Sequence, residues 1–167
     1  HSLTIIFIFM KKPLLFCLLL VFIGLVSCKK ANAVDPNKLQ DEKPISTKCY
    51  QALYENDTID LEMNTLKNGK ISGNMVMSFL NMPKKIGKIN GEFRGDTLFV
   101  DYSFIQGANK DRKFKNPMAI LKKGDTLVLG NGKIESHLGV SYFVKGEPID
   151  FDKVKYKFTS VDCGDAE

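Results

Sequence analysis

The clearest pattern in the chain is an alternation of apolar and polar residues. Over residues 153–158, lysines alternate with Val154, Tyr156 and Phe158. One apolar and one polar face per strand is typical of an antiparallel sheet with a solvated side. No segment shows a helical period of comparable length. The pattern predicts strands at about 47–54, 58–66, 70–79, 86–93, 97–105, 112–121, 126–129 running on to 134, 139–145 and 153–161.

Short turns separate these segments. Gly and Asn, which accept the positive φ of tight hairpin turns, recur between the strand-like runs. A weak repeat of Asp-Thr followed by apolar residues begins at Asp57, Asp96 and Asp125. We therefore expect consecutive hairpins that form an antiparallel meander. Their Asp and Thr side chains are expected to bond the turn backbone rather than a metal.

Residues 10–27 have the arrangement of a secretory signal peptide. Met10 is followed by Lys11 and Lys12, and then by an apolar run that ends at Val26. This run is shorter than the roughly 20 residues that a membrane-spanning helix needs. We interpret residues 1–9, which precede the first Met, as upstream sequence translated from a misplaced start.

The signal ends in Leu25-Val26-Ser27-Cys28, which resembles the lipobox of bacterial lipoproteins. The resemblance implies cleavage before Cys28 and lipidation of its thiol, with acyl chains that anchor the protein to a membrane. The alternative is an ordinary signal peptide with an incidental cysteine. Residues 28–46 are polar and charged, as expected of a flexible tether. A folded domain is then predicted at 47–163, followed by a tail at 164–167.

The cysteine count and the charge change once the signal is set aside. The chain of 167 residues has four Cys and a formal charge of +5. Without residues 1–27 the charge falls to +3, and Cys17 is lost with the signal. With Cys28 lipidated, Cys49 and Cys163 remain as a candidate disulfide in an exported protein, where such bonds persist. The alternative is two free thiols.

The positions of these two cysteines bear on the fold class. Cys49 lies in the first predicted strand and Cys163 follows the last one. A disulfide would make these strands neighbours, because bonded cysteines have Cα atoms within about 7 Å. A meander whose ends meet is a closed barrel without exposed edges. We predict an all-β, lipocalin-like antiparallel barrel of about eight strands; the alternative is an open β-sandwich.

Several short motifs are distributed over the predicted domain: Cys49-Tyr50, the Gly-Asp-Thr-Leu turns, Asp101-Tyr102-Ser103-Phe104, Gly107, Arg112 and the closing Cys163. Together they resemble a family of small uncharacterised bacterial lipoproteins. The resemblance implies a β-barrel lipid-anchored in the cell envelope, with the outer membrane as the expected location, and it implies no activity. The barrel is also similar to copper-resistance lipoproteins, but their Cys-x-x-Cys motif is missing here.

Residues suited to catalysis are few in the predicted domain. His137 is its one histidine, and the sequence has no Gly-x-Ser-x-Gly motif. Glu135 and His137 share a strand face, but a third metal ligand is not evident. Asp60 and Glu62 are adjacent on an outward face, where carboxylates are solvated rather than placed in a cleft. We expect a protein without enzymatic activity, and we predict no cofactor and no metal.

A barrel of about eight strands either fills with side chains or encloses one small ligand. Methionines and tyrosines on the predicted inner faces are candidate contacts for an apolar or amphipathic ligand: Met63, Met75, Met77, Tyr102, Tyr142 and Tyr156. The alternative for the methionines is core filling, since Met packs irregular interiors. Thioethers also suit Cu(I).

Basic residues gather in three parts of the domain, at 84–88, 110–115 and 153–157. Anionic lipid headgroups attract such clusters, but the interleaved acids favour a solvated surface. A nucleic-acid partner is not expected for an exported protein. The alternative function is binding of an envelope protein through loops at 81–88 or 105–115.

Overall fold

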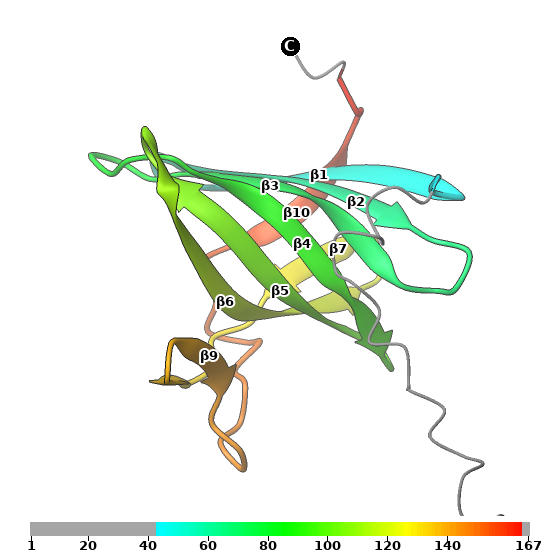
Figure 1. Cartoon of the computed structure of the whole chain (residues 1–167). Helices are drawn as coiled ribbons and strands as arrows, with labels where there is room; N and C mark the ends of the chain where they lie inside the picture. Colours follow the sequence, from blue (N-terminus) through cyan, green and yellow to red (C-terminus); the bar gives the residue numbers. More distant parts are fainter. Residues whose placement is uncertain (1–42, 165–167) are drawn as a thin grey trace, which may run out of the picture. The chain divides into compact units, whose positions relative to one another are not determined.

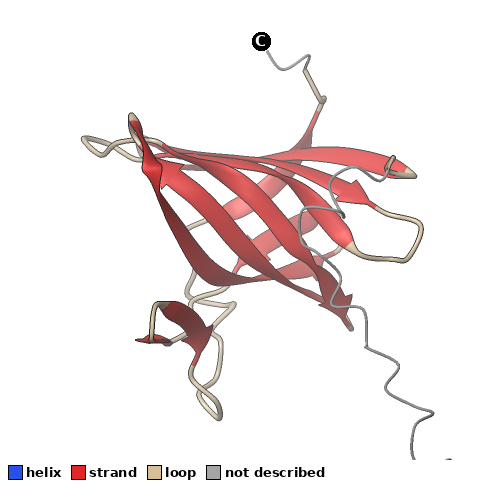
Figure 2. Cartoon of the chain, viewed as in Figure 1, coloured by secondary structure: helices blue, strands red, loops and turns tan. Residues whose placement is uncertain are grey.

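The computed structural model describes residues 43–164, and every regular element in them is a β-strand (Figures 1 and 2). Eight strands form a closed antiparallel barrel in the order β1-β10-β7-β6-β5-β4-β3-β2. The predicted barrel is therefore confirmed, and the open sandwich is excluded. The barrel strands are β1 (Ser46–Tyr54), β2 (Asp57–Thr65), β3 (Ile71–Ser78), β4 (Lys85–Arg94), β5 (Thr97–Gln106), β6 (Asn109–Lys123), β7 (Thr126–Leu129) and β10 (Lys157–Val161).

The predicted export signal lies outside the described residues. This holds for the upstream residues 1–9, the signal peptide at 10–27 and Cys28. The tether is described only from residue 43 onward, and the tail only at Gly164. The lipid anchor therefore stays a prediction.

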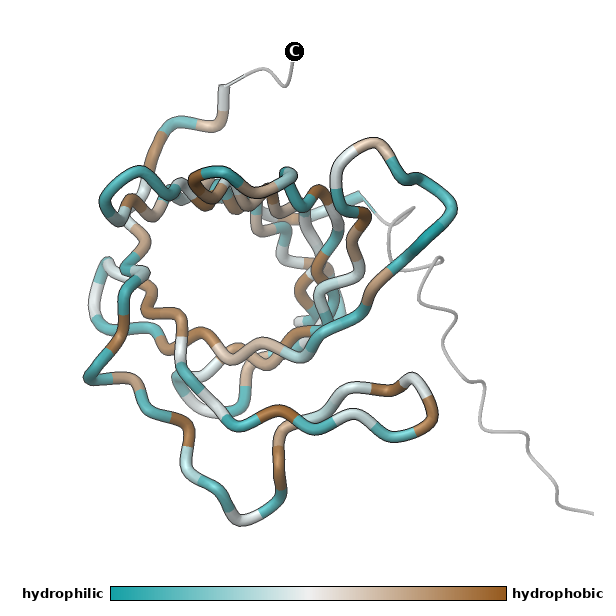
Figure 3. Tube along the Cα trace, turned by 90° about the vertical axis from the view of Figure 1, so that its left-hand side faces the viewer, coloured by the Kyte–Doolittle hydropathy of each residue, from teal (hydrophilic) through white to brown (hydrophobic). Residues whose placement is uncertain are grey.

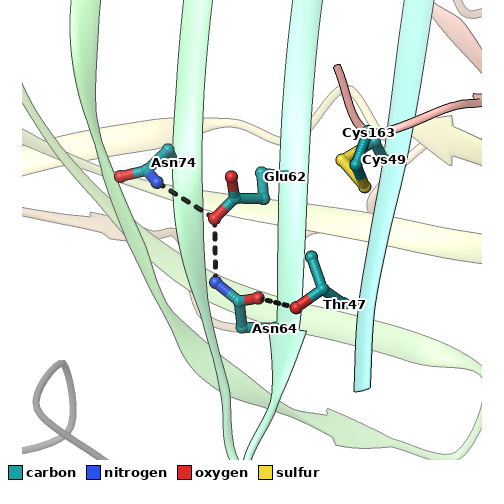
Figure 4. Close-up of a disulfide and its surroundings, with 6 residues drawn as sticks. All are labelled: Thr47, Cys49, Glu62, Asn64, Asn74 and Cys163. Carbon is teal, nitrogen blue, oxygen red and sulfur yellow. Dashed lines mark hydrogen bonds between the residues drawn. A yellow bond between two sulfur atoms is a disulfide. The ribbon is translucent and has the colours of Figure 1, made fainter. Parts of the chain in front are cut away.

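β1 and β10 close the barrel, which Figure 3 shows as a ring. Cys49 is in register with Val161, and Ala52 is in register with Phe158. A disulfide joins Cys49 to Cys163 across this seam, with a Cα–Cα distance of 5.2 Å and a sequence separation of 114 (Figure 4). The expected pairing of the two cysteines is thus found at the junction of the first and last strands.

A polar network ties β1 to β2 and β3 on the outer surface near the disulfide (Figure 4). The Thr47 hydroxyl donates to Asn64 Oδ1 at 2.6 Å. Glu62 Oε1 accepts from the amides of Asn64, at 2.9 Å, and Asn74, at 3.1 Å. Asp60 accepts from Gln51 at 2.8 Å. Asp60 and Glu62 therefore lie on the outward face as predicted, where both bond neighbouring side chains.

Apolar side chains fill the interior at alternate strand positions. In β2, Ile59, Leu61 and Met63 are buried while Asp60 is exposed. This alternation is the physical basis of the strand pattern in the sequence. The buried core cluster consists of Tyr50, Ala52, Ile59, Leu61, Met63, Ile71, Met75, Met77, Ile89, Leu98, Val100, Tyr102, Phe104, Met118, Ile120, Leu127 and Phe158.

Two glycines let neighbouring strands approach closely. A Cβ atom at Gly73 in β3 would lie 1.9 Å from the carbonyl oxygen of Glu62, and one at Gly91 in β4 would lie 1.9 Å from that of Phe99. Any side chain at either position would displace the backbone of the adjacent strand. Glycine inside a strand is typical of sharp bends at barrel corners. These two positions therefore allow β3 and β4 to curve into the barrel.

The chain leaves the barrel between β7 and β10, and here the strand predictions are wrong. β7 ends at Leu129 instead of running on to 134. The predicted barrel strand at 139–145 is part of a separate hairpin formed by β8 (Ile134–His137) and β9 (Val140–Phe143). Val140 and Tyr142, expected on a core face, are 62% and 43% exposed. A free hairpin alternates just as a barrel strand does, so its period does not distinguish the two.

The segment between β7 and β10, residues 130–156, is here termed the excursion. Backbone hydrogen bonds fix its base: Asn131 N donates to Asp150 O at 2.8 Å, and Asp150 N donates to Asn131 O at 2.9 Å. Leu129 N also donates to Tyr156 O at 3.1 Å. Residues 153–156 belong to the excursion. β10 therefore begins at Lys157, and the predicted start at 153 was too early.

Candidate functional site

The two ends of the barrel carry different structures. The disulfide end holds the links at 66–70, 95–96 and 124–125 together with the Cys49–Cys163 bond. The open end holds the links at 55–56, 79–84 and 107–108 together with the excursion. The excursion is by far the longest of these connections, so the open end carries more chain outside the barrel than the disulfide end does.

The barrel wall is incomplete at the open end. β6 pairs with β5 along most of its length, but it pairs with β7 only from Ile120↔Leu129 to Lys123↔Thr126. One further bond joins Gly130 N to Ala119 O at 2.9 Å. Pro117, which has no N–H to donate, lies in the part of β6 that β7 does not cover. Asn116 is in register with buried Tyr102, yet Asn116 itself is exposed, and β7 does not pair with β6 at this position.

A cavity of about 330 Å³ lies at this end of the barrel. Its volume falls at the lower end of the range of about 300–1,000 Å³ typical of small-molecule sites. Ile59, Met77 and Met118 from the barrel core form part of its wall, and Ile134 and Phe143 from the β8–β9 hairpin form another part. The pocket is therefore bounded by the core on one side and by the excursion on the other.

Aromatic rings make up much of the pocket wall. Tyr102 stacks on Phe104 with ring centroids 4.7 Å apart, and Phe104 stacks in turn on Phe114 at 5.3 Å. Phe79 stacks on Tyr156 at 5.8 Å. All of these rings except Phe114 line the pocket. Stacked aromatic rings provide a large, rigid apolar surface.

The hydroxyl of Tyr102 is satisfied by the protein backbone. It lies 3.1 Å from the carbonyl oxygens of both Met75 and Lys85, on adjacent strands. Burial raises the pKa of the Tyr102 phenol far above its ordinary value of 10.0. A neutral phenol bonded to backbone oxygens leaves its ring, rather than its hydroxyl, as the surface for a ligand.

Tyr156 and Asp57 tie together three segments at the open end. The Tyr156 hydroxyl donates to Asp57 Oδ2 at 2.7 Å, and the Leu80 N–H donates to Asp57 Oδ1 at 3.0 Å. The Leu80 N–H, followed by the Tyr156 hydroxyl, holds the pKa of the Asp57 carboxyl below its ordinary value of 3.8. Burial and the Asp57 carboxylate raise the pKa of Tyr156 to about 12. The contact fixes the aromatic wall to the start of β2.

Lys85 places a positive charge beside two of these aromatic rings, Phe79 and Phe104. It is in register with buried Met77, and directly opposite residues share a face of the sheet, so Lys85 lies on the inner face. Its Nζ is 5.5 Å from the ring centroids of both Phe79 and Phe104. No carboxylate among residues 43–164 lies within ion-pair distance of Lys85.

The structure brings together some of the predicted ligand contacts and separates the others. Met77, Tyr102 and Tyr156 line the pocket. Met63 and Met75 are buried in the core cluster and do not line it. Tyr142 lies on β9 outside the barrel, so its placement on an inner barrel face was wrong.

Sequence reasoning missed several pocket residues. Phe79 follows the end of β3, and Ile134 and Phe143 belong to the unforeseen hairpin. Lys85 belongs to the basic segment 84–88, for which the sequence predicts a solvated surface. Its spacing of four from the buried Ile89 along β4 was the signal that it shares the inner face.

The remaining candidates do not form a second site of comparable character. A hollow of about 590 Å³ on the outer surface is lined largely by outward-facing residues such as Val76, Ile86 and Lys113. Another, of about 660 Å³, lies beside the disulfide and is mostly polar. Within residues 43–164, no three His, Cys, Asp or Glu side chains gather closely enough to hold a metal ion. No helix in this part of the chain is long and apolar enough to cross a membrane.

No protein-family model, no curated protein and no solved structure matches this chain.

Proposed function

We propose that this is a lipid-anchored protein of a bacterial cell envelope that binds a small apolar or amphipathic ligand at the open end of its barrel. The observation that carries the proposal is the cavity of about 330 Å³, where core side chains and stacked aromatic rings meet the excursion. The lipobox-like Leu25–Cys28 segment and the family resemblance support the anchor.

The filled core limits where a ligand can lie. Side chains such as Leu61, Met63 and Leu98 pack the interior toward the disulfide end. A ligand would therefore occupy the cavity at the open end and would not extend along the whole barrel axis. We propose that it enters beside Asn116, an exposed residue on the part of β6 that does not pair with β7.

We also propose that the protein acts by binding rather than by catalysis. Two groups at the aromatic wall that could act as acid or base, the Asp57 carboxylate and the Tyr102 phenol, already have structural partners. Both Asp57 carboxylate oxygens accept hydrogen bonds, and the Tyr102 hydroxyl bonds backbone carbonyls. On the β8–β9 hairpin, the Ser141 hydroxyl is hydrogen-bonded to the Ser136 hydroxyl at 2.8 Å.

Extraction of a bound molecule tests the binding proposal. The purified chain is extracted with organic solvent, and the extract is examined by mass spectrometry beside that of Asn116→Trp. The indole at position 116 is expected to fill the pocket mouth and to abolish both co-purification and binding of a fluorescent apolar probe. Lys113→Trp, which adds the same side chain to the outer face of β6, should bind like the wild type. Equal binding by all three proteins would overturn the proposal.

A second candidate function is docking of an envelope protein on the β8–β9 hairpin instead of the predicted loops at 81–88 and 105–115, since residues 85–88 and 109–115 belong to strands β4 and β6. Leu138 at its tip is 91% exposed and has a φ of 50°, a left-handed conformation that is unusual for a large side chain. Val140 beside it is also largely exposed. A photo-crosslinking residue at 138 should then capture one partner in the native envelope, whereas the same residue at Lys67 should not. Identical crosslinks from the two positions would remove this candidate.

A further inference from the structure

We infer that the ligand of this pocket is an amphiphile with an anionic head group, and that Lys85 binds that group. The inference rests on the proposed function and adds the chemical class of the ligand. It is carried by the placement of one lysine at an apolar cavity, without a carboxylate of the described chain to neutralise it.

Lys85 is held on the inner face by its place in the sheet. It stands opposite Met77 on β3 and Gln106 on β5, and its side chain lines the cavity with both neighbouring rings, Phe79 and Phe104. The distances of 5.5 Å from Nζ to both ring centroids place the ammonium group over aromatic faces. Rings of this kind attract a cation without neutralising its charge.

The acidic group of the open end is already bonded elsewhere. The two carboxylate oxygens of Asp57 accept hydrogen bonds from Leu80 N and from Tyr156, and neither bonds Lys85. The described ion pairs use other lysines, namely Lys70, Lys115 and Lys123. The Lys85 ammonium therefore has donor capacity for a ligand.

These features define a two-part ligand. Its apolar portion would pack on Met77, Phe104 and Phe143, and its anionic group would accept charge-assisted hydrogen bonds from Lys85. A carboxylate and a phosphate share this chemistry. A neutral amphiphile would fill the same cavity but would leave the ammonium unpaired beside a desolvated surface, at a cost in affinity.

Calorimetric titration of the purified chain with dodecanoate, dodecyl phosphate and dodecanol tests the inference. The anionic probes should bind about tenfold to a hundredfold more tightly than dodecanol, because a hydrogen bond to a charged group contributes this much to affinity. Lys85→Met should remove this preference, and dodecanol should bind the variant at least as tightly as the wild type, because it no longer leaves an ammonium group unpaired. Lys84→Met, which removes the same charge from the adjacent exposed residue, should keep it. The better of the two anions identifies carboxylate or phosphate as the head group.

A charge reversal keeps the test decisive if Lys85→Met perturbs the fold. Lys85→Glu should prefer dodecylammonium to dodecanoate, the opposite of the wild type. If all probes bind the wild type equally, and the Lys85 variants match it, the head-group inference fails while the apolar pocket stands. If neither the anionic probes nor dodecanol bind the wild type, the proposed function itself fails.

Discussion

The Tyr156 hydroxyl donates a hydrogen bond of 2.7 Å to Asp57 Oδ2, joining residues 99 positions apart in the chain. Asp57 begins β2, and Tyr156 ends the excursion just before β10. Asp57 also accepts from Leu80 N in the link between β3 and β4. A single carboxylate therefore fixes both the end of the excursion and the aromatic pair Phe79–Tyr156 that lines the pocket.

The Asp57 contact predicts an acid-dependent stability. Because folding lowers the pKa of Asp57, its carboxylate stabilises the fold above the ordinary value of 3.8, and that contribution is lost as the pH falls through the lower folded value. Asp57→Asn should therefore unfold in less denaturant than the wild type near neutral pH. The gap between the two proteins should close in acid. A difference that does not change with pH would contradict the role of the carboxylate.

The hydrogen bond from Tyr156 to Asp57 predicts a second change in stability, at alkaline pH. Folding raises the Tyr156 pKa from 10.0 to about 12, so the neutral phenol stabilises the fold below pH 10.0, and this contribution disappears between the two values. Phenol titration followed by NMR should show one tyrosine ionising near pH 12. That signal should be missing in Tyr156→Phe and should move to lower pH in Asp57→Asn. A tyrosine titration unaffected by Asp57→Asn would contradict the contact.

The close approach of β4 and β5 at Gly91 predicts that this position does not tolerate a side chain. Gly91→Ala would bring a methyl group within 1.9 Å of the Phe99 carbonyl oxygen, so β4 and β5 would have to separate. We expect a loss of about 3 kcal/mol in the free energy of unfolding, at the upper end of overpacking costs. Gly164→Ala is the matched control, because its Cβ would meet no atom within 4 Å. Equal stability of the two variants would show that the strands are farther apart.

The seam between β1 and β10 predicts a strong dependence on the disulfide. The bond links residues 114 positions apart, and disulfides that close long loops stabilise proteins by about 2–4 kcal/mol. Cys49→Ala/Cys163→Ala should unfold in correspondingly less denaturant than the oxidised wild type. Reducing agent should affect the wild type and not the double variant. Non-reducing peptide mapping that finds both thiols free would contradict the bond.

Much of the barrel follows from the sequence because its strands have one wet and one dry face. The alternation located β2 and β5, and the two cysteines correctly indicated that the first and last strands meet. The excursion was not predicted because Val140 and Tyr142 occupy alternate positions in β9, as they would in a barrel strand. Pro117 within a predicted strand was a local signal that part of β6 has no partner on one side.

The candidate site was only partly predictable for a related reason. Met77, Tyr102 and Tyr156 were found because they occupy apolar alternation positions. Met63 has the same pattern but lies toward the disulfide end, and periodicity carries no information on depth along the barrel. Lys85 was missed because its charge suggested solvent, although its register places it opposite Met77.

The central claim is that the open end of the barrel, and not the rest of its interior, binds an amphiphile. Selective ¹³C-methyl labelling of methionine, followed by NMR titration with dodecanoate, tests it most directly. Met77 and Met118 line the pocket, whereas Met63 lies in the packed core and Met82 is exposed on the link between β3 and β4. We predict saturable shifts of the Met77 and Met118 methyl signals, with the signals of Met63 and Met82 unchanged. Shifts confined to Met82, or no shift of any methionine, would contradict it.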